Sequence, residues 1–275
     1  MNYRHAFHAG NFADCFKHAL LVRLLRVLAA KPKPFRVLDT HAGTGGYDLA
    51  APEAARTGEW ERGILRLLDI ESGPFADYAE LMRAAGAPNS YPGSPAIIRS
   101  LLRAEDHLLA CELHPEDHAA LRARFRHDPQ VAVHLRDGWE ALRGLTPFPE
   151  RRGLILVDPP FEQEGEFERM AAGIALVSHR FRAAIQACWY PIKHRAPVRA
   201  FHQALRDGGT RDLIAVEIWL REPTDAQRLN GCGLLVANPP WHFAEEAGAI
   251  LHEMLGLLGD REPGEGWSVT RVAEE

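Results

Sequence analysis

The tetrapeptide Asp158-Pro159-Pro160-Phe161 combines the groups that could hold a planar amine in an enzyme site. It follows the apolar run 154–157, which is typical of a buried strand, so the motif should lie at a strand's carboxyl end. The Asp carboxylate and the Pro159 carbonyl can accept the hydrogens of an exocyclic amine, while the prolines donate no N–H. The aromatic ring offers a stacking face, worth about 1–3 kcal/mol for a base. The motif predicts a pocket suited to methylating an amino group on a nucleobase.

A second motif of the same type, Asn-Pro-Pro-Trp at 238–241, is the alternative position for this site. It follows the apolar run 232–237. The loop between this run and the preceding one, 213–220, has no helix-length apolar pattern, so we expect the two strands to pair antiparallel. The end of the later strand would then lie on the opposite edge of the sheet, with Asn238 in a strand-to-helix turn. We therefore place the amine site at Asp158.

Strand and helix patterns alternate along the chain and predict an α/β fold. Apolar, β-branched runs indicate strands, and apolar residues at helical spacing indicate helices. The alternation predicts a doubly wound, mostly parallel sheet with an antiparallel last strand and with ligands at the strands' carboxyl ends. The predicted strands are 35–39, 108–112, 131–135, 153–157, 184–189, 213–220 and 232–237. The predicted helices are 12–30, 96–104, 115–127 and one that runs on to about residue 258.

A glycine-rich turn follows the first predicted strand, with Asp39, Gly43 and Gly45 in the pattern D-x-x-x-G-x-G. Glycines allow the backbone to approach a ligand closely, and the segment beyond them can offer free N–H groups. The third glycine of the dinucleotide fingerprint is missing, because Asp48 stands in its place. An acid there suits a pyrophosphate poorly, so a nicotinamide-dependent oxidoreductase is disfavoured.

Carboxylates also stand at the ends of the next predicted strands. Glu112 could accept the ribose hydroxyls of an adenosine ligand, and Asp137 could accept its adenine amine, with Gly138 leaving room for the ring. Acids often merely cap the helices that follow strands. Together with Asp39 and Asp158, however, four such acids stand in register at four strand ends. They favour a cationic cofactor without phosphate, namely S-adenosylmethionine (SAM), which carries a sulfonium and an ammonium.

The composition predicts a globular protein, with 46% hydrophobic and 25% charged residues. The net charge of −5 decides nothing about nucleic acid, and a basic cluster taken alone is most often solvated surface. No apolar run approaches the roughly 18 residues of a membrane span, and the start lacks a secretion signal's apolar region. The cysteines are far apart without C-x-x-C pairing, which is typical of reduced, buried thiols in a cytoplasmic protein. They are Cys15, Cys111, Cys188 and Cys232.

Histidines are numerous, with 14 in the chain, but none forms a metal motif. His5 and His8 have no carboxylate or cysteine at a ligand spacing. His114 and His118 share a helical spacing but lack the glutamate of a zincin motif. We therefore predict no metal site.

With these residues in view, the chain resembles the bacterial 23S rRNA (adenine-N6)-methyltransferase J family. The similarity runs nearly end to end and is carried by specific segments rather than by composition. It departs from the family's usual Asp-Pro-Pro-Tyr at Phe161, which keeps the stacking face but lacks the phenol's hydrogen bond. The matching segments, in chain order, are 3–14, 17–18, 38–43, 91–95, 112–115, 136–138, 151–156, 189–191 and 238–241.

The resemblance implies a Rossmann-like class I SAM-dependent methyltransferase, formed as a single domain over 1–275. It also implies a small helical insertion subdomain, which the Ala- and Glu-rich segment 48–92 fits. The implied partner is 23S rRNA, methylated at N6 of the adenine at position 2030. We expect a monomer that binds neither membrane nor metal.

The resemblance also assigns individual roles. Tyr3 would contact the RNA, and His5 and Lys17 would support the site, Lys17 as part of the catalytic group. Together with the bottom-up assignment of Asp39 and Gly43, the predicted SAM-binding residues are His18, Asp39, His41, Gly43, Ser94, Glu112, Asp137, Gly138 and Asp158.

The expected mechanism is in-line transfer of a methyl group to adenine N6. Asp158 and the Pro159 carbonyl would accept the amine hydrogens, and Phe161 would stack on a base flipped out of any helix. The same motif tolerates other amines, so methylation of DNA or of a protein glutamine is the alternative, although no target-recognition domain is evident. A non-catalytic RNA-binding protein with a vestigial SAM fold is a further alternative, which the intact Asp158 opposes.

Overall fold

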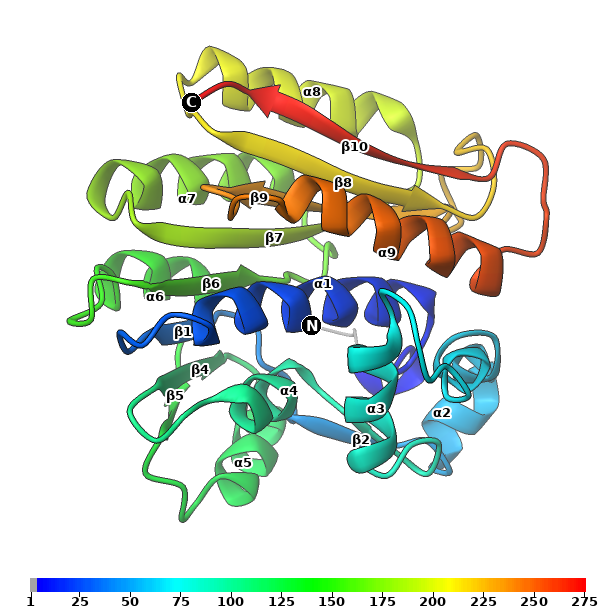
Figure 1. Ribbon diagram of the computed structural model, residues 1–275, viewed down its shortest axis with the longest axis horizontal. Coiled ribbons are helices and arrows are strands. Elements are labelled where there is room, and N and C mark those ends of the chain that lie inside the picture. Colours follow the sequence, from blue (N-terminus) through cyan, green and yellow to red (C-terminus); the bar gives the residue numbers. More distant parts are fainter. Residues whose placement is uncertain (1–3) are drawn as a thin grey trace.

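A mixed sheet of eight strands forms the centre of the computed structural model, which describes residues 4–275 (Figure 1). The strand order is β10-β8-β9-β7-β6-β1-β4-β5. Neighbours from β7 to β5 pair in parallel, whereas β9 is antiparallel to both β7 and β8, and β10 is antiparallel to β8. The strands are β1 (Arg36–Asp39), β4 (His107–Glu112), β5 (Val131–Leu135), β6 (Gly153–Val157), β7 (Ala184–Ile192), β8 (Leu213–Trp219), β9 (Gly231–Ala237) and β10 (Gly266–Ala273).

The predicted α/β class and its mostly parallel sheet are confirmed, with one correction at the carboxyl terminus. The strand predicted as the last, β9, is antiparallel as expected, but it inserts between β7 and β8. The chain then returns to add β10 as an edge strand, which the sequence pattern did not predict. Only Val272 of β10 is buried, so this strand presents little of the apolar pattern that marks a strand.

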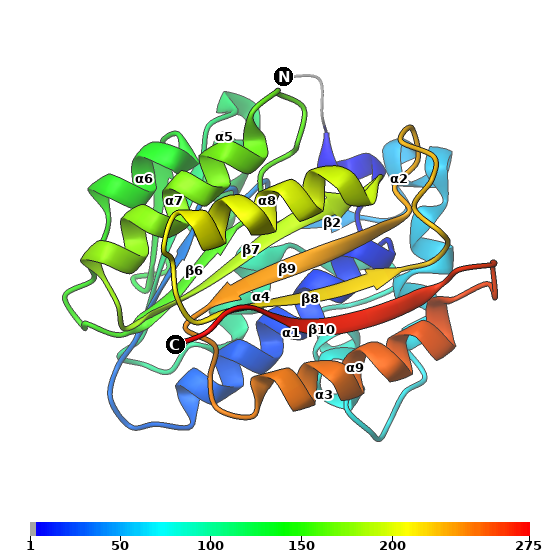
Figure 2. The ribbon, with the colours of Figure 1, turned by 90° about the horizontal axis from the view of Figure 1, so that it is seen from above.

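Helices cover both faces of the sheet (Figure 2). The core on one face is built from α1, α4 and α9, and the core on the other from α6, α7 and α8. No helix among residues 4–275 is both long and apolar enough to cross a membrane. All four cysteines are free and buried. The helices are α1 (Phe12–Ala29), α4 (Ser94–Leu101), α5 (Pro115–Arg124), α6 (Gly138–Gly144), α7 (Glu166–Arg180), α8 (Arg195–Asp207) and α9 (Phe243–Leu258).

Helix α1 is buried along most of its length because it packs on the sheet with leucines at helical spacing. Its amino terminus is capped by Asn11, whose side-chain oxygen accepts the Asp14 N–H at 2.9 Å. Three polar residues of its first turns, Asp14, Lys17 and His18, are nevertheless buried. Buried charges need partners, so this end of α1 must face other polar groups.

Short elements fill the segment between β1 and α4. They are β2 (Gly46–Asp48), α2 (Pro52–Thr57), the 3₁₀ turns η2 (Glu59–Arg62) and η3 (Ile64–Leu67), α3 (Ala76–Ala84) and β3 (Ser90–Pro92). β2 and β3 form a separate two-stranded antiparallel sheet, which the sequence did not predict because three residues are too few to show a period. The segment packs against the amino-terminal turn η1 (His5–Phe7) and the residues after it, since the Ile64 N–H donates to the Gly10 carbonyl at 2.9 Å.

Candidate active site

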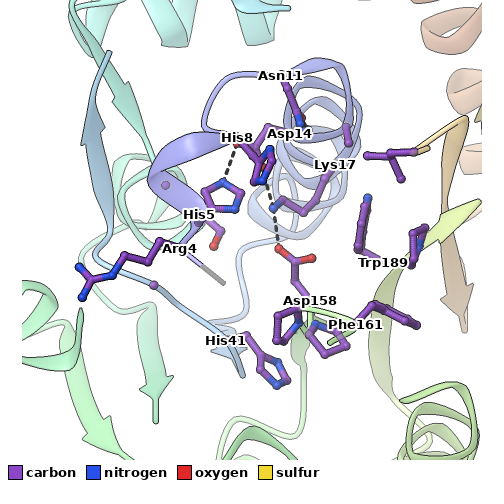
Figure 3. A pocket seen from close by; sticks show the side chains of 18 of the residues that line it. Arg4, His5, His8, Asn11, Asp14, Lys17, His41, Asp158, Phe161 and Trp189 are labelled. Carbon is purple, nitrogen blue, oxygen red and sulfur yellow. Dashed lines mark hydrogen bonds and ion pairs between the residues drawn. The ribbon is translucent and has the colours of Figure 1, made fainter. Parts of the chain in front are cut away.

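A cavity of about 1280 Å³ opens where the parallel strands end, and the amino terminus of α1 and the α2 segment form part of its wall (Figure 3). Tyr3 lies outside the described residues. Asp39 is the one described site residue from the sequence analysis that does not line the cavity. Those that do are His5, Lys17, His18, His41, Gly43, Ser94, Glu112, Asp137, Gly138, Asp158, Pro159 and Phe161.

The wall on the β4 and β5 side carries ordered carboxylates. Glu112 accepts the Gly43 N–H at 2.9 Å and the His114 N–H at 2.7 Å, and burial raises the pKa of its carboxyl group. Asp137 caps α6 by accepting two backbone N–H groups through one oxygen. At Gly138, a Cβ atom would lie 2.5 Å from the Thr40 carbonyl oxygen, so no side chain fits there. The cavity wall at this point is therefore bare backbone.

Asp39 lies beneath this wall rather than in it. Its side chain is fully buried, and it accepts a hydrogen bond from the Ser94 hydroxyl at 2.6 Å and one from the His41 N–H at 3.4 Å. Burial raises the pKa of Asp39 to about 7, with the charge of Asp158 adding to the effect. Asp39 therefore does not line the cavity, and its contact with the cofactor stays a prediction. It holds Ser94 and the backbone of His41, which do line the cavity.

A buried ion-pair chain holds the carboxylate of Asp158. Lys17 Nζ donates to Asp158 Oδ2 at 2.5 Å and to Asp14 Oδ1 at 3.0 Å (Figure 3). Asp14 Oδ2 in turn accepts from the Gly10 N–H at 3.0 Å and pairs with His5 Nε2 at 2.8 Å. Although burial opposes it, the charges of His5 and Lys17 hold the pKa of Asp14 well below its usual range.

The charge of Lys17 is stabilised from both sides. Burial disfavours its ammonium, but Asp14 and Asp158 raise the pKa of Lys17 well above its usual value. A charged Lys17 between two carboxylates fixes the orientation of Asp158 and leaves its other oxygen, Oδ1, without a hydrogen bond among residues 4–275. Asp14 falls in the family-matching segment 3–14, but its part in this ion-pair chain was not predicted, because a polar residue on a helix is normally solvated.

Two histidines in the wall are neutral. Burial lowers the pKa of His41 to about 4, and burial with the charge of Lys17 lowers the pKa of His18 well below its usual value. His18 Nδ1 bonds the Tyr91 hydroxyl at 2.7 Å, while its buried Nε2 has no hydrogen bond among the described residues. A buried polar atom costs free energy until it is paired, so His18 Nε2 marks a point where a ligand's polar group fits.

Phe161 adopts a backbone conformation that aromatic residues rarely take, with φ at 51°. Such a left-handed residue costs on the order of 1–3 kcal/mol and persists where surrounding contacts enforce it. Its ring packs edge-on against Phe167 at 5.0 Å and Trp189 at 6.0 Å between centroids. Trp189 also lines the cavity. A role for Trp189 in the site was not predicted, although Trp189 lies in β7, the strand that pairs with β6 just before Asp158.

The competing motif lies at the other edge of the sheet. Ala237, at the end of β9, pairs with Leu213 and Gln186 near the beginnings of β8 and β7. The Asn238 side chain donates to the Ala184 carbonyl at 3.2 Å and does not line the cavity. No group of three potential metal ligands occurs among residues 4–275.

The strand order, the carboxylates at neighbouring strand ends and the Asp-Pro-Pro-Phe turn together define the class I SAM-dependent methyltransferase fold. The crystal structure described as a probable spermidine synthase from Corynebacterium glutamicum shares this fold, with a TM-score of 0.51 at 14% identity over 95% of this chain and 75% of that one.

A narrower relationship follows from the family comparison. The model described as ribosomal RNA large subunit methyltransferase D, RlmJ, matches residues 32–270, and the chain belongs to this family. The ribosomal RNA large subunit methyltransferase J of Escherichia coli is 38% identical over 256 residues, 91% of each chain. The enzyme of the same name from Haemophilus influenzae is 34% identical over the full length of both chains. A crystal structure of a Legionella pneumophila protein superposes with a TM-score of 0.87 at 32% identity, over 96% of this chain and 98% of that one.

Proposed function

We propose that this protein transfers the methyl group of SAM to N6 of an adenine in 23S rRNA. The observation that carries the proposal is the Asp158 carboxylate, which lines the cavity and which Lys17 holds by one oxygen while the other oxygen remains available. Family membership supports ribosomal RNA as the substrate. The exact nucleotide, the adenine at position 2030, rests on the family resemblance alone.

The cavity wall on the β4 and β5 side fits SAM by its chemistry. Carboxylates at Glu112 and Asp137 suit ribose hydroxyls and an adenine amine, and bare backbone at Gly138 lets a flat ring approach. The unpaired Nε2 of His18 supplies a further polar contact. When bound, SAM would supply an electrophilic methyl group. Ser94, His41 and Gly43 complete the residues that would hold it.

The target amine would bind between Asp158 and the ring of Phe161. Asp158 Oδ1 and the Pro159 carbonyl would accept its two hydrogens, which keeps the nitrogen lone pair directed away from the adenine ring. Stacking on Phe161 is worth about 1–3 kcal/mol and favours a base that has left its helix. Acceleration would come mainly from positioning and electrostatics.

Lys17 has a positioning role in this scheme. It neutralises Asp158 and fixes its rotamer, so that the carboxylate accepts hydrogen bonds in one geometry. Asp158 need not act as a strong base, because a methylated amine releases its proton readily. His5 lines the cavity and supports the same network through Asp14, and with Tyr3 it would lie near the RNA.

The test is methylation of 23S rRNA from cells that lack the modification, with isotope-labelled SAM and mass mapping of nuclease digests. Label is expected in N6-methyladenine within one fragment, and the Asp158→Ala variant should bind SAM but leave the fragment unlabelled. Label absent from adenine would reject the proposal. Label in duplex DNA or in a glutamine-containing protein, supplied in parallel, would favour the alternative substrates.

A further inference from the structure

The cavity extends well beyond the wall that fits the cofactor. Pockets for small ligands usually hold about 300–1000 Å³, and this one exceeds that range. Its acidic wall lies on the β4 and β5 side of β6. On the other side of β6, the lining comes from the residues after β7, from the connection between β8 and β9, and from the end of α9. The 3₁₀ turn η2 lines the cavity as well.

Three cations line this extension. Arg62 lies in η2, Lys193 follows β7 and Arg228 precedes β9, and all three are exposed. Among residues 4–275, none of their charged groups makes a hydrogen bond or an ion pair within 4 Å. We call the part of the cavity lined by these three residues the cationic arm.

Two acids of the same region are already paired with arginines. Asp260, at the end of α9, pairs with Arg66 at 2.9 Å, and Glu262 pairs with Arg221 at 2.8 Å. The charge of Arg228 also helps to lower the pKa of Glu262, after the larger effect of Arg221. The three arm cations therefore remain available to a ligand, although the net charge of the chain is −5. Cations that line a cavity attract anionic partners to it.

The arm has two walls and an apolar lining. The connection between β8 and β9 and the segment that carries α2 project from the same end of the molecule, the end at which β6 and β7 finish (Figures 1 and 2). Arg62 belongs to one wall and Arg228 to the other. Trp189, of β7, and Leu220 and Leu229, of the β8–β9 connection, also line the cavity. Cations combined with aromatic and apolar surface are the pattern of grooves that hold single-stranded nucleic acid.

We propose that the cationic arm binds the RNA strand that flanks the target adenine. Arg62, Lys193 and Arg228 would contact backbone phosphates, and a neighbouring base would stack in the apolar lining beside Trp189. The proposal rests on the proposed function, since it extends the site of Asp158 along the strand that delivers the base. It would also give a net acidic chain a place to contact RNA, because these unpaired cations line the same cavity as Asp158.

The test compares salt dependence of RNA binding. A labelled 23S rRNA fragment containing the target adenine would be titrated with the wild-type protein and with a triple variant that replaces the three arm cations by Gln. Each lost phosphate contact to a single strand reduces the slope of log affinity against log salt by about 0.7. The triple variant should therefore show a slope shallower by about 2. Between about 50 and 200 mM salt the wild type would lose roughly twentyfold more affinity than the variant.

A matched control replaces three exposed cations at the opposite edge of the sheet, Lys31, Lys33 and Arg182, also by Gln. This control should keep the wild-type slope. In the methylation assay, the arm variant should raise KM for RNA with kcat at saturating RNA unchanged, and its affinity for SAM should equal that of the wild type.

Two results would overturn the assignment of the arm. One is an unchanged salt slope in a triple variant that still melts at the wild-type temperature. The other is equal competition by polyglutamate of matched charge, which would indicate a site for acidic protein. Failure of the proposed function is a separate outcome. In that case the wild-type protein would leave rRNA adenine unlabelled in the methylation assay, whatever the salt dependence of RNA binding.

Discussion

The two Pro-Pro-aromatic motifs share a sequence pattern but lie at opposite edges of one sheet, and their first residues and their aromatic rings have different surroundings. Asp158 accepts a hydrogen bond from a buried lysine, whereas Asn238 donates to a backbone carbonyl. The ring of Phe161 is packed between other aromatic rings, whereas Trp241 is 83% exposed. The direction of the strand decides the difference, because β6 ends at the cavity and β9 runs the opposite way.

The comparison teaches that such a motif becomes a site only where other elements converge on it. At Asp158 these elements are the amino terminus of α1, the ends of β1, β4 and β5, and the aromatic residues of β7 and α7. At Asn238 the same tetrapeptide pattern only turns the chain from β9 into α9.

The largest effect is expected from the cation that distinguishes the two motifs. Lys17→Met should lower the free energy of unfolding by about 3–5 kcal/mol, because the buried Asp14 and the half-buried Asp158 lose their shared partner. Arg23→Met in the same helix is the control, since its pair with Glu246 is about one-third exposed and should contribute less than about 1 kcal/mol. Urea denaturation measures both. Equal losses in the two variants would mean that the Lys17 chain is no stronger than a surface pair.

The next effect concerns the acids and amides at the start of each motif. Asp158→Asn should reduce kcat for RNA methylation by about 10²–10³-fold, because one acceptor for the target amine becomes a poorly oriented amide. Asn238→Ala should leave kcat unchanged. Single-turnover labelling of the rRNA fragment measures both variants, with SAM affinity followed by calorimetry. A comparable loss in the Asn238 variant would reverse the assignment of the two motifs.

A smaller effect is expected at the aromatic positions. Phe161→Ala should weaken transition-state binding of the RNA by about 1–3 kcal/mol, the value of one stacked base, and Phe161→Tyr should retain activity. Trp241→Ala is the matched change at the other edge and should not alter kcat/KM. The comparison fails if Phe161→Ala retains full kcat/KM for the RNA fragment.

The smallest effect is a pH dependence at the amino-terminal segment. His8 Nδ1 forms a hydrogen bond with a carboxylate oxygen of Glu59 at 3.0 Å. This bond raises the pKa of His8, although burial opposes the shift. It also lowers the pKa of Glu59 against the opposite effect of burial. The contribution of His8 to the free energy of unfolding is present below its unfolded pKa of 6.5 and is lost as pH rises through the raised pKa of the folded protein. The contribution of Glu59 to the free energy of unfolding is present above its unfolded pKa of 4.5 and is lost as pH falls through the lowered pKa of the folded protein.

Glu59→Gln should therefore destabilise the protein most between pH 4.5 and 6.5, by less than about 1 kcal/mol because the pair is partly exposed. Glu245→Gln, in the exposed His242 pair beside the second motif, is the control and should have no measurable effect. Thermal melts of both variants and the wild type at pH 6 and pH 8.5 measure the loss of stability at each pH. A loss that is the same at both pH values would exclude an ionic contribution from His8.

Most of the sheet could be predicted from the sequence because its central strands are continuous apolar runs. β6 is buried at every residue, so its pattern was unambiguous. β10 was missed because an edge strand buries few side chains, and β2 and β3 because they are three residues long. The direction of β9 was predicted from the absence of a crossover helix, but its insertion between two earlier strands was not, since spatial order depends on long-range pairing.

The site was predictable where its residues end strands and unpredictable where burial defines them. Glu112 and Asp137 line the cavity because consecutive parallel strands end at the same edge. Asp39 ends a strand too, yet it is fully buried and does not line the cavity, so strand-end position alone does not decide which acids face the cavity. The role of Asp14 was not predicted, although the residue falls in the matching segment 3–14, since only the tertiary structure shows that this face of α1 is buried.

The insertion of β9 between β7 and β8 has a consequence during protein synthesis. β7 spans nine residues, Ala184–Ile192, and most of them are apolar and buried. Its outer edge cannot be paired until residues 231–237 have left the ribosome. An apolar strand edge of this length invites intermolecular pairing while it waits. Nascent chains truncated before residue 231 should therefore aggregate, whereas chains truncated after α9 should lack only the outer edge strand β10.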